Sequence, residues 1–138
     1  MQASPATPIR RFNPSDLGPP AGYSQVVEVQ ADRIIFIAGQ TALGKNGELI
    51  GAGDFAAQVD QVFRNLATAL VAVSCTAANL VKLTVFLRDM ANLGAYREAR
   101  NRFFSTASPP AAPAVTLIEV SKLYGPDFLV EIEAIAAA

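Results

Sequence analysis

The feature that most constrains the fold is a helical repeat of apolar residues in the middle of the chain. Asp54 has a side chain suited to an N-cap, and after it apolar residues recur at steps of three and four to about Ser74. This repeat predicts a helix on the order of 30 Å long with one apolar face. A second helix is predicted over residues 91–104. One side of that helix would carry Leu93, Tyr96, Ala99, Arg100 and Phe103.

Strand-like segments lie on both sides of these helices. Runs or alternating patterns of apolar and β-branched residues predict strands, and Gly, Asn, Asp and Pro between them predict the turns. The predicted strands are 23–30, 33–38, a short one within 44–50, 81–87, 114–121 and 128–136. Long helices set among strands predict an α+β fold, in which one mainly β-sheet carries two helices on one face. The other face of the sheet would be left bare.

Chain length and composition indicate what covers that face. The 138 residues suit a single domain over 1–138, with about 1–13 as a loosely ordered N-terminal lead rich in Pro, Ala and Ser. Hydrophobic residues make up 51% of the chain and charged residues 17%. Because a small domain with so few charges favours the covering of apolar surface by another subunit, we expect an oligomer.

Charge, cysteine content and hydropathy argue against several classes of partner. The net charge of −1 without a basic stripe disfavours nucleic-acid binding. No apolar run reaches the roughly 20 residues of a membrane span, and the first residues lack the apolar core of a signal peptide. The single cysteine, Cys75, excludes an internal disulfide and suits a small hydrophobe in a reducing compartment. We therefore expect a soluble cytoplasmic protein with no membrane or nucleic-acid partner.

The absence of histidine from the sequence restricts the chemistry. Histidine is the commonest general base and metal ligand, so neither a Ser-His-Asp nor a Cys-His arrangement can form. A zinc site would have to use carboxylates and one Cys, and no metal site is expected. Any catalysis must use Glu, Asp, Arg, Lys, Tyr, Ser, Thr or backbone groups, with water as a bound reactant.

Two groups of residues are candidates for a site on the strands. Glu131 and Glu133 share one face of a predicted strand. They are either a solvent-facing or ion-paired edge, with Lys82 or Lys122 as the cation, or they include a carboxylate that holds water as a general base. Tyr23 is either a core aromatic at a strand start or the wall of a pocket.

The arginines of the second predicted helix form a third group, Arg97, Arg100 and Arg102. Glu98 lies four residues before Arg102, and this spacing indicates an ion pair on a solvated face. The alternative is that one arginine reaches a neighbouring cleft and binds a carboxylate there.

Four stretches of the sequence resemble the Rid family, the reactive intermediate deaminases also called YjgF/YER057c/UK114 proteins. They are GYSQVVEV at 22–29, IIFIAGQTALGKNGELI at 34–50, QVFRNLATALVAVSCTAANLVKLTVFLRDM at 61–90 and VEIEAIA at 130–136. The resemblance implies a chorismate-mutase-like α+β fold and a homotrimer with three clefts between subunits. It also implies hydrolysis of enamines and imines to 2-keto acids and ammonia without a metal or another cofactor.

The family's site residues carry over one by one. Its substrate-binding Arg lies in a Pro-Ala-Arg-Ser/Thr segment, which here reads Pro-Ala-Val-Thr, so Val115 stands at the Arg position. Its water-activating Glu corresponds to Glu131. The resemblance thus implies Glu131 as the catalytic residue and, as substrate-binding residues, Tyr23, Gly39, Gln40, Arg97, Val115 and Thr116.

Val115 changes what this site is expected to bind. A carboxylate would meet an apolar wall instead of a guanidinium, so the expected ligand is more apolar or uncharged, and acceleration of 2-aminoacrylate breakdown should be small. Two functions remain open: a cofactor-free hydrolase of the Rid type with an altered small-molecule substrate, and a non-catalytic module that binds a metabolite or a protein. An endoribonuclease, the family's older description, is disfavoured by the near-neutral charge and the lack of His.

Overall fold

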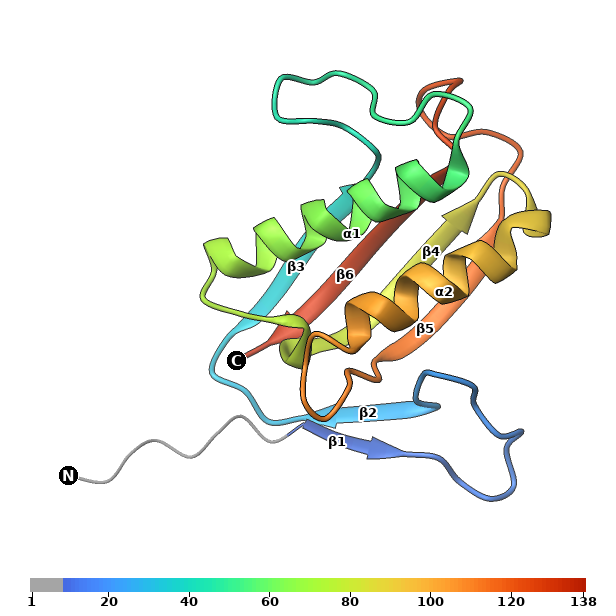
Figure 1. Ribbon diagram of the computed structural model, residues 1–138. Helices are drawn as coiled ribbons and strands as arrows, with labels where there is room; N and C mark the ends of the chain where they lie inside the picture. The colour runs from blue at the N-terminus through green and yellow to red at the C-terminus, as the bar shows by residue number, and fades with distance from the viewer. Residues whose placement is uncertain (1–8) are drawn as a thin grey trace.

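The computed structural model describes residues 9–138, in which three strands are followed by a helix, a strand, a second helix and two final strands (Figure 1). Two short 3-10 turns, Ala77–Asn79 and Met90–Asn92, precede β4 and α2. The elements are β1 (Ile9–Phe12), β2 (Val26–Val29), β3 (Ile34–Gln40), α1 (Phe55–Ala72), β4 (Leu80–Leu87), α2 (Leu93–Phe104), β5 (Ala114–Glu119) and β6 (Val130–Ala137).

A four-stranded sheet in the order β3-β6-β4-β5 forms the centre of the molecule. Strands β4 and β5 are parallel and are joined through α2, whereas β6 runs antiparallel to both of its neighbours. Both helices lie on the same face of this sheet (Figure 1). The predicted α+β class, with two helices on one face, is confirmed.

The long helical repeat forms α1 and supplies much of the core. The Asp54 carboxylate accepts a hydrogen bond of 3.1 Å from the Ala57 backbone N–H, which satisfies one of the free donors at the helix start. Cys75, just beyond the helix end, is 2% exposed, as predicted for a small hydrophobe. The side chains of α1 that are buried against the sheet and α2 are Phe55, Gln58, Val59, Val62, Phe63, Leu66 and Leu70.

Two segments of residues 9–138 differ from their predictions. The lead expected over 1–13 contains β1, which pairs antiparallel with β2, and Arg11 Nε donates 3.2 Å to the Ala112 carbonyl. Pairing with a distant segment thus orders residues whose local composition suggested a loose chain. The other eight residues, 1–8, lie outside the described part. The short strand expected within 44–50 is only an isolated bridge between Leu43 and Leu49, because Gly47, with φ of 80°, turns the chain.

An ion-pair prediction on α2 was also wrong. Arg102 Nη2 lies 3.0 Å from Asp60 Oδ1 of α1, so the arginine bridges the two helices instead of pairing with Glu98 on its own helix. The ion pair between the two helices is formed, and the predicted pair within α2 is not. No helix in residues 9–138 is long and apolar enough to span a membrane.

The face of the sheet opposite the helices carries exposed apolar side chains. Phe36 on β3 is 76% exposed, and Ile34 and Ile118 are 49% and 42% exposed. Along β3, the exposed Ile34 and Phe36 alternate with Ile35 and the buried Ile37, so this strand contributes side chains to both faces of the sheet. We call this surface the open face.

Candidate functional site

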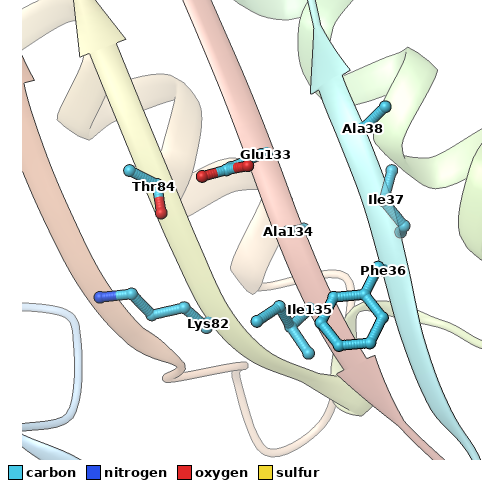
Figure 2. Close-up of a pocket in the computed structure, with 8 residues that line it drawn as sticks. All are labelled: Phe36, Ile37, Ala38, Lys82, Thr84, Glu133, Ala134 and Ile135. Carbon is cyan, nitrogen blue, oxygen red and sulfur yellow. The ribbon is translucent and has the colours of Figure 1, made fainter.

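A shallow hollow of about 350 Å³ lies on the open face, over β3, β6 and β4 (Figure 2). Thr84 is paired with Glu133 across the β4–β6 ladder, and in the close-up the Glu133 side chain is directed towards β4. Lys82 Nζ donates a hydrogen bond of 2.7 Å to Thr116 Oγ1 on β5. The hollow combines a mostly apolar floor with one carboxylate and one ammonium. Its labelled residues are Phe36, Ile37, Ala38, Lys82, Thr84, Glu133, Ala134 and Ile135.

Glu131 lies on the same face, two residues before Glu133 on β6. Its side chain packs against Gly39 of β3, where a Cβ would come within 2.9 Å of the Glu131 Cδ. The absence of a side chain at Gly39 therefore makes room for the carboxyl group. The neighbouring Gln40 follows a bulge in β3 and donates 3.1 Å to the Ala38 carbonyl of its own strand.

The Glu131 carboxyl has electrostatic surroundings unlike those of a surface glutamate. Burial raises its pKa above the ordinary value, and the negative charge of Glu133 raises it further. Within residues 9–138 it has no hydrogen bond and no ion pair, so neither Lys82 nor Lys122 neutralises it. A half-buried carboxyl without a fixed protein partner is free to hold and deprotonate a water molecule.

A second group of predicted residues meets on the other side of the sheet. Tyr23, Arg97 and Val115 line a cavity of about 230 Å³ between β5 and α2. Val115 is paired with the fully buried Leu83 on β4, which places its side chain on the helix side. We call this cavity the α2 pocket. Its lining residues are Ala21, Tyr23, Leu93, Tyr96, Arg97, Arg100, Val115 and Leu117.

The predicted residues thus fall into two groups that one chain keeps apart. Gly39 and Glu131 are on the open face, whereas Tyr23, Arg97 and Val115 are in the α2 pocket. Thr116, next to Val115, points to the open face because successive residues of a strand alternate, and it contacts Lys82.

Sequence reasoning left Arg100 among the surface arginines, although it is only 5% exposed. Its Nε and Nη2 donate 3.2 and 3.1 Å to Asn101 Oδ1, and Nη2 donates 3.3 Å to the Ala21 carbonyl. The guanidinium lies over the rings of Tyr96 and Phe104, at 5.8 and 5.9 Å from their centroids. Its place on the apolar side of the predicted helix was the signal that could have identified it.

No cluster of three or more His, Cys, Asp or Glu side chains that could hold a metal ion is present in residues 9–138. The ionisable groups of the two sites are instead two carboxyls, one ammonium, two guanidinium groups and two phenols. They belong to Glu131, Glu133, Lys82, Arg97, Arg100, Tyr23 and Tyr96.

Comparison with known proteins places the chain in a family. The sequence profile of the family described as Endoribonuclease L-PSP matches residues 14–138. A RutC family protein from Synechocystis is 36% identical over 124 residues, covering 89% of this chain and 88% of the relative. The mouse 2-iminobutanoate/2-iminopropanoate deaminase is 36% identical over 123 residues, covering 89% of this chain and 84% of the relative.

Solved structures agree with this relationship. The Rid family protein YyfB from Yersinia pestis superimposes with a TM-score of 0.84 at 35% identity, covering 94% of this chain and 98% of that one. E. coli TdcF, crystallised with bound serine, superimposes with a TM-score of 0.70 at 27% identity, covering 91% of this chain and 93% of that one. The chain described here therefore belongs to the Endoribonuclease L-PSP family, the group also called the Rid or YjgF/YER057c/UK114 family.

Proposed function

We propose that the protein is a cofactor-free hydrolase of a small imine or enamine, with its site in clefts between the subunits of a homotrimer and with Glu131 as general base. The observation that carries the proposal is the Glu131 carboxyl, which packs against Gly39 without an ion pair in the described chain and has a raised pKa. A base with a raised pKa is a better proton acceptor near neutral pH than an ordinary glutamate. The 36% identity to the mouse deaminase supports the reaction class.

The proposed chemistry needs only water and one proton carrier. With the imine nitrogen protonated, Glu131 takes a proton from water as the water oxygen attacks the imine carbon, which gives a neutral carbinolamine and a protonated Glu131. Glu131 then returns this proton to the nitrogen. The C–N bond breaks as the carbinol O–H proton passes to Glu131, ammonia leaves with the electron pair of that bond, and the oxygen becomes the carbonyl of the product. Glu131 finally gives its proton to ammonia or to solvent. An enamine enters the same sequence after a proton moves to its carbon. No electrons are gained or lost, so no oxidant or reductant is required.

The separation of the two groups of residues supports a site in clefts between subunits. Glu131 and Gly39 are on the open face and the α2 pocket is on the helix side, so a second copy of the chain must contribute one group if both serve one substrate. The apolar open face, with Phe36 76% exposed, gives the copies a surface to bury. For the homotrimer that the family resemblance implies, light scattering should give three times the mass of one chain.

The substrate is proposed to differ from that of the deaminases because of Val115. A valine offers no hydrogen bond to a carboxylate, so a substrate held only by the β5 position would lose a charge-assisted contact. TdcF with bound serine supports a ligand of amino-acid size in this family. The small cavity of the α2 pocket, about 230 Å³, also fits such a molecule.

Replacement of one carboxyl tests the proposal directly. Threonine dehydratase with threonine or serine generates 2-iminobutanoate or 2-aminoacrylate in the assay, and ammonia release is followed with and without the protein. For whichever imine the protein hydrolyses, Glu131→Gln should lower the rate about 100-fold or more, as expected for loss of a general base. Binding of the product 2-oxobutanoate should persist.

Glu133→Gln is the matched control, because Glu133 lies on the same strand and face but is more exposed. It should change the rate by less than about threefold, since only the smaller cause of the raised Glu131 pKa is removed. If wild-type protein binds 2-oxobutanoate but hydrolyses neither imine, hydrolysis of these two imino acids is rejected, and a metabolite-binding module on the same fold is favoured. Equal loss of rate in the two variants would reject Glu131 as the base.

A further inference from the structure

The α2 pocket holds positive charge that the described chain does not neutralise. Arg100 is 5% exposed, and no carboxylate of residues 9–138 lies within 4.0 Å of it. Arg97 lines the same cavity, and no Asp or Glu is among the lining residues. Burial of an unpaired charge is costly, so buried guanidinium groups are normally found with an anion.

The hydrogen bonds of Arg100 use only one side of its guanidinium. Nε and Nη2 donate to Asn101 Oδ1 and the Ala21 carbonyl, whereas Nη1 has no hydrogen-bond partner in residues 9–138. The two N–H groups of Nη1 are therefore available to donate to a ligand. The existing contacts hold the fork in place, which lowers the entropy lost when it binds a ligand.

Tyr96 supplies an unused donor in the same cavity. It is 1% exposed, and its hydroxyl is a buried polar atom without a hydrogen-bond partner in the described chain. Burial raises the pKa of Tyr96 to about 12, so the hydroxyl keeps its proton at neutral pH. The charge of Arg100, the closeness of its guanidinium to the hydroxyl and the charge of Arg97 act in the opposite direction. Buried hydroxyls without partners are uncommon in proteins, and Tyr96, although it belongs to the hydrophobic core, is also a lining residue of the α2 pocket.

We propose that the α2 pocket is a carboxylate-binding site, in which Arg100 Nη1 and the Tyr96 hydroxyl donate to the carboxylate and Arg97 adds positive charge. The identification of that carboxylate as part of the substrate rests on the function proposed above. Arg100 thus takes, from helix α2, the role that the family resemblance gives to an arginine at position 115. The ligand is then a small acid, and the expectation of an uncharged ligand, drawn from Val115 alone, is replaced.

Calorimetric titration with a matched pair of probes tests the charge of the ligand. The pair is 2-oxobutanoate and its neutral analogue 2-oxobutanamide, which differ at the carboxylate only. The wild-type protein should bind the acid at least about tenfold more tightly than the amide, because two donors and a nearby cation act on the charged form. Equal affinity for the two probes, or binding of inorganic phosphate in place of 2-oxobutanoate, would overturn the proposal.

Two variants test the residues. Tyr96→Phe removes only the hydroxyl, which has no partner in the described chain, so the melting temperature should be unchanged or higher while the affinity for 2-oxobutanoate falls about tenfold. Arg100→Met should lower that affinity more, about 30-fold or greater, and abolish the preference for the acid. A merely structural Tyr96 or Arg100 would alter the melting temperature and leave the ratio of acid to amide affinity unchanged.

Arg102→Met on the same helix is the control, because Arg102 is exposed and pairs with Asp60. It should leave both affinities within about twofold of wild type; an equal loss in this variant would refute a specific role for Arg100. Titration of Glu131→Gln separates this proposal from the hydrolase. Carboxylate binding without any imine hydrolysis would reject the hydrolase alone, whereas hydrolysis that is unaffected in Arg100→Met and Tyr96→Phe would reject the carboxylate site alone.

Discussion

Two charged side chains of this molecule each occupy space that a glycine leaves free, and they differ in how far one chain completes their surroundings. Glu131 packs against Gly39 on the open face and has no hydrogen bond or ion pair within residues 9–138. Arg100 packs against Gly22, where a Cβ would lie 3.0 Å from its Cζ, and it has three hydrogen bonds and two aromatic neighbours.

The difference indicates that the two regions become functional at different stages of assembly. The α2 pocket is already built in one chain, because Asn101 and Ala21 orient Arg100. Glu131 lies on an apolar surface. If a second subunit covered this surface, the Glu131 carboxyl would lose contact with water, and its pKa, which is already raised by burial, would rise further. We therefore expect ligand binding to survive in a single chain and hydrolysis to require the assembled protein.

The largest expected effect comes from breaking the assembly at Phe36. Phe36→Glu places a charge at a side chain that is 76% exposed in one chain and that we expect to be buried between subunits. Light scattering should show a monomer, imine hydrolysis should fall at least about 100-fold, and most of the affinity for 2-oxobutanoate should remain. Circular dichroism should show an unchanged fold.

Val71→Glu is the control for this experiment, since Val71 is 72% exposed on the outer side of α1. Its mass and activity should match those of wild type. If Phe36→Glu gives a monomer that hydrolyses imines at the normal rate, the two regions act independently of assembly, and the site between subunits is wrong.

Intermediate effects should come from adding one methyl group at each glycine. Gly39→Ala would displace the end of a flexible Glu131 side chain, so we expect about a tenfold slower hydrolysis with unchanged binding of 2-oxobutanoate. Gly22→Ala meets the Arg100 guanidinium and also forces alanine to a φ of 79°, which costs about 1 to 2 kcal/mol. Gly22→Ala should therefore lower the melting temperature in thermal denaturation and weaken the binding of 2-oxobutanoate in titration. Gly39→Ala should change neither.

The elements that the sequence predicted well are those with strong local patterns. The apolar repeat after Asp54 and the alternation along β4 each bury one face, and the burial of Leu66 and Leu83 follows from spacing alone. β1 was missed because a four-residue strand with two arginines has little local signal and depends on pairing with β2. Arg102 was misassigned for the same reason, since Asp60 is distant in sequence.

The sequence identified most residues of the site, but not that they lie on opposite faces of the sheet. Motif positions identified Glu131, Tyr23 and Val115, yet nothing local shows that Val115 points towards the helices while Glu131 points away from them. That division depends on the strand register. Arg100 was the main omission, because an arginine on a helix is usually solvated. Its place on the apolar side of the predicted helix was the local signal of burial, and the tertiary contacts with Gly22 and Ala21 confirm it.

The smallest expected effect concerns the stability cost of Glu131. Its pKa is raised in the folded protein, so between the unfolded and folded pKa values the native state binds more protons than the unfolded chain. The free energy of unfolding therefore falls as the pH rises through that interval, and the cost is complete above the folded pKa. Glu131→Gln removes the charge, and its melting temperature at pH 7 should exceed that of wild type by about 1 to 3 °C.

Thermal melts of the two proteins from pH 7 down to about pH 3.5 check the sign, because the unfolded glutamate titrates near pH 4.3. The advantage of Glu131→Gln should shrink as the wild-type carboxyl becomes protonated. Glu133→Gln should give a smaller rise, since the Glu133 charge is the lesser cause of the raised pKa. A variant that is less stable than wild type at pH 7 would mean that the ionised carboxyl has a favourable partner in the assembled protein, and Glu131 would then resemble Arg100 in being held in place instead of free to bind water.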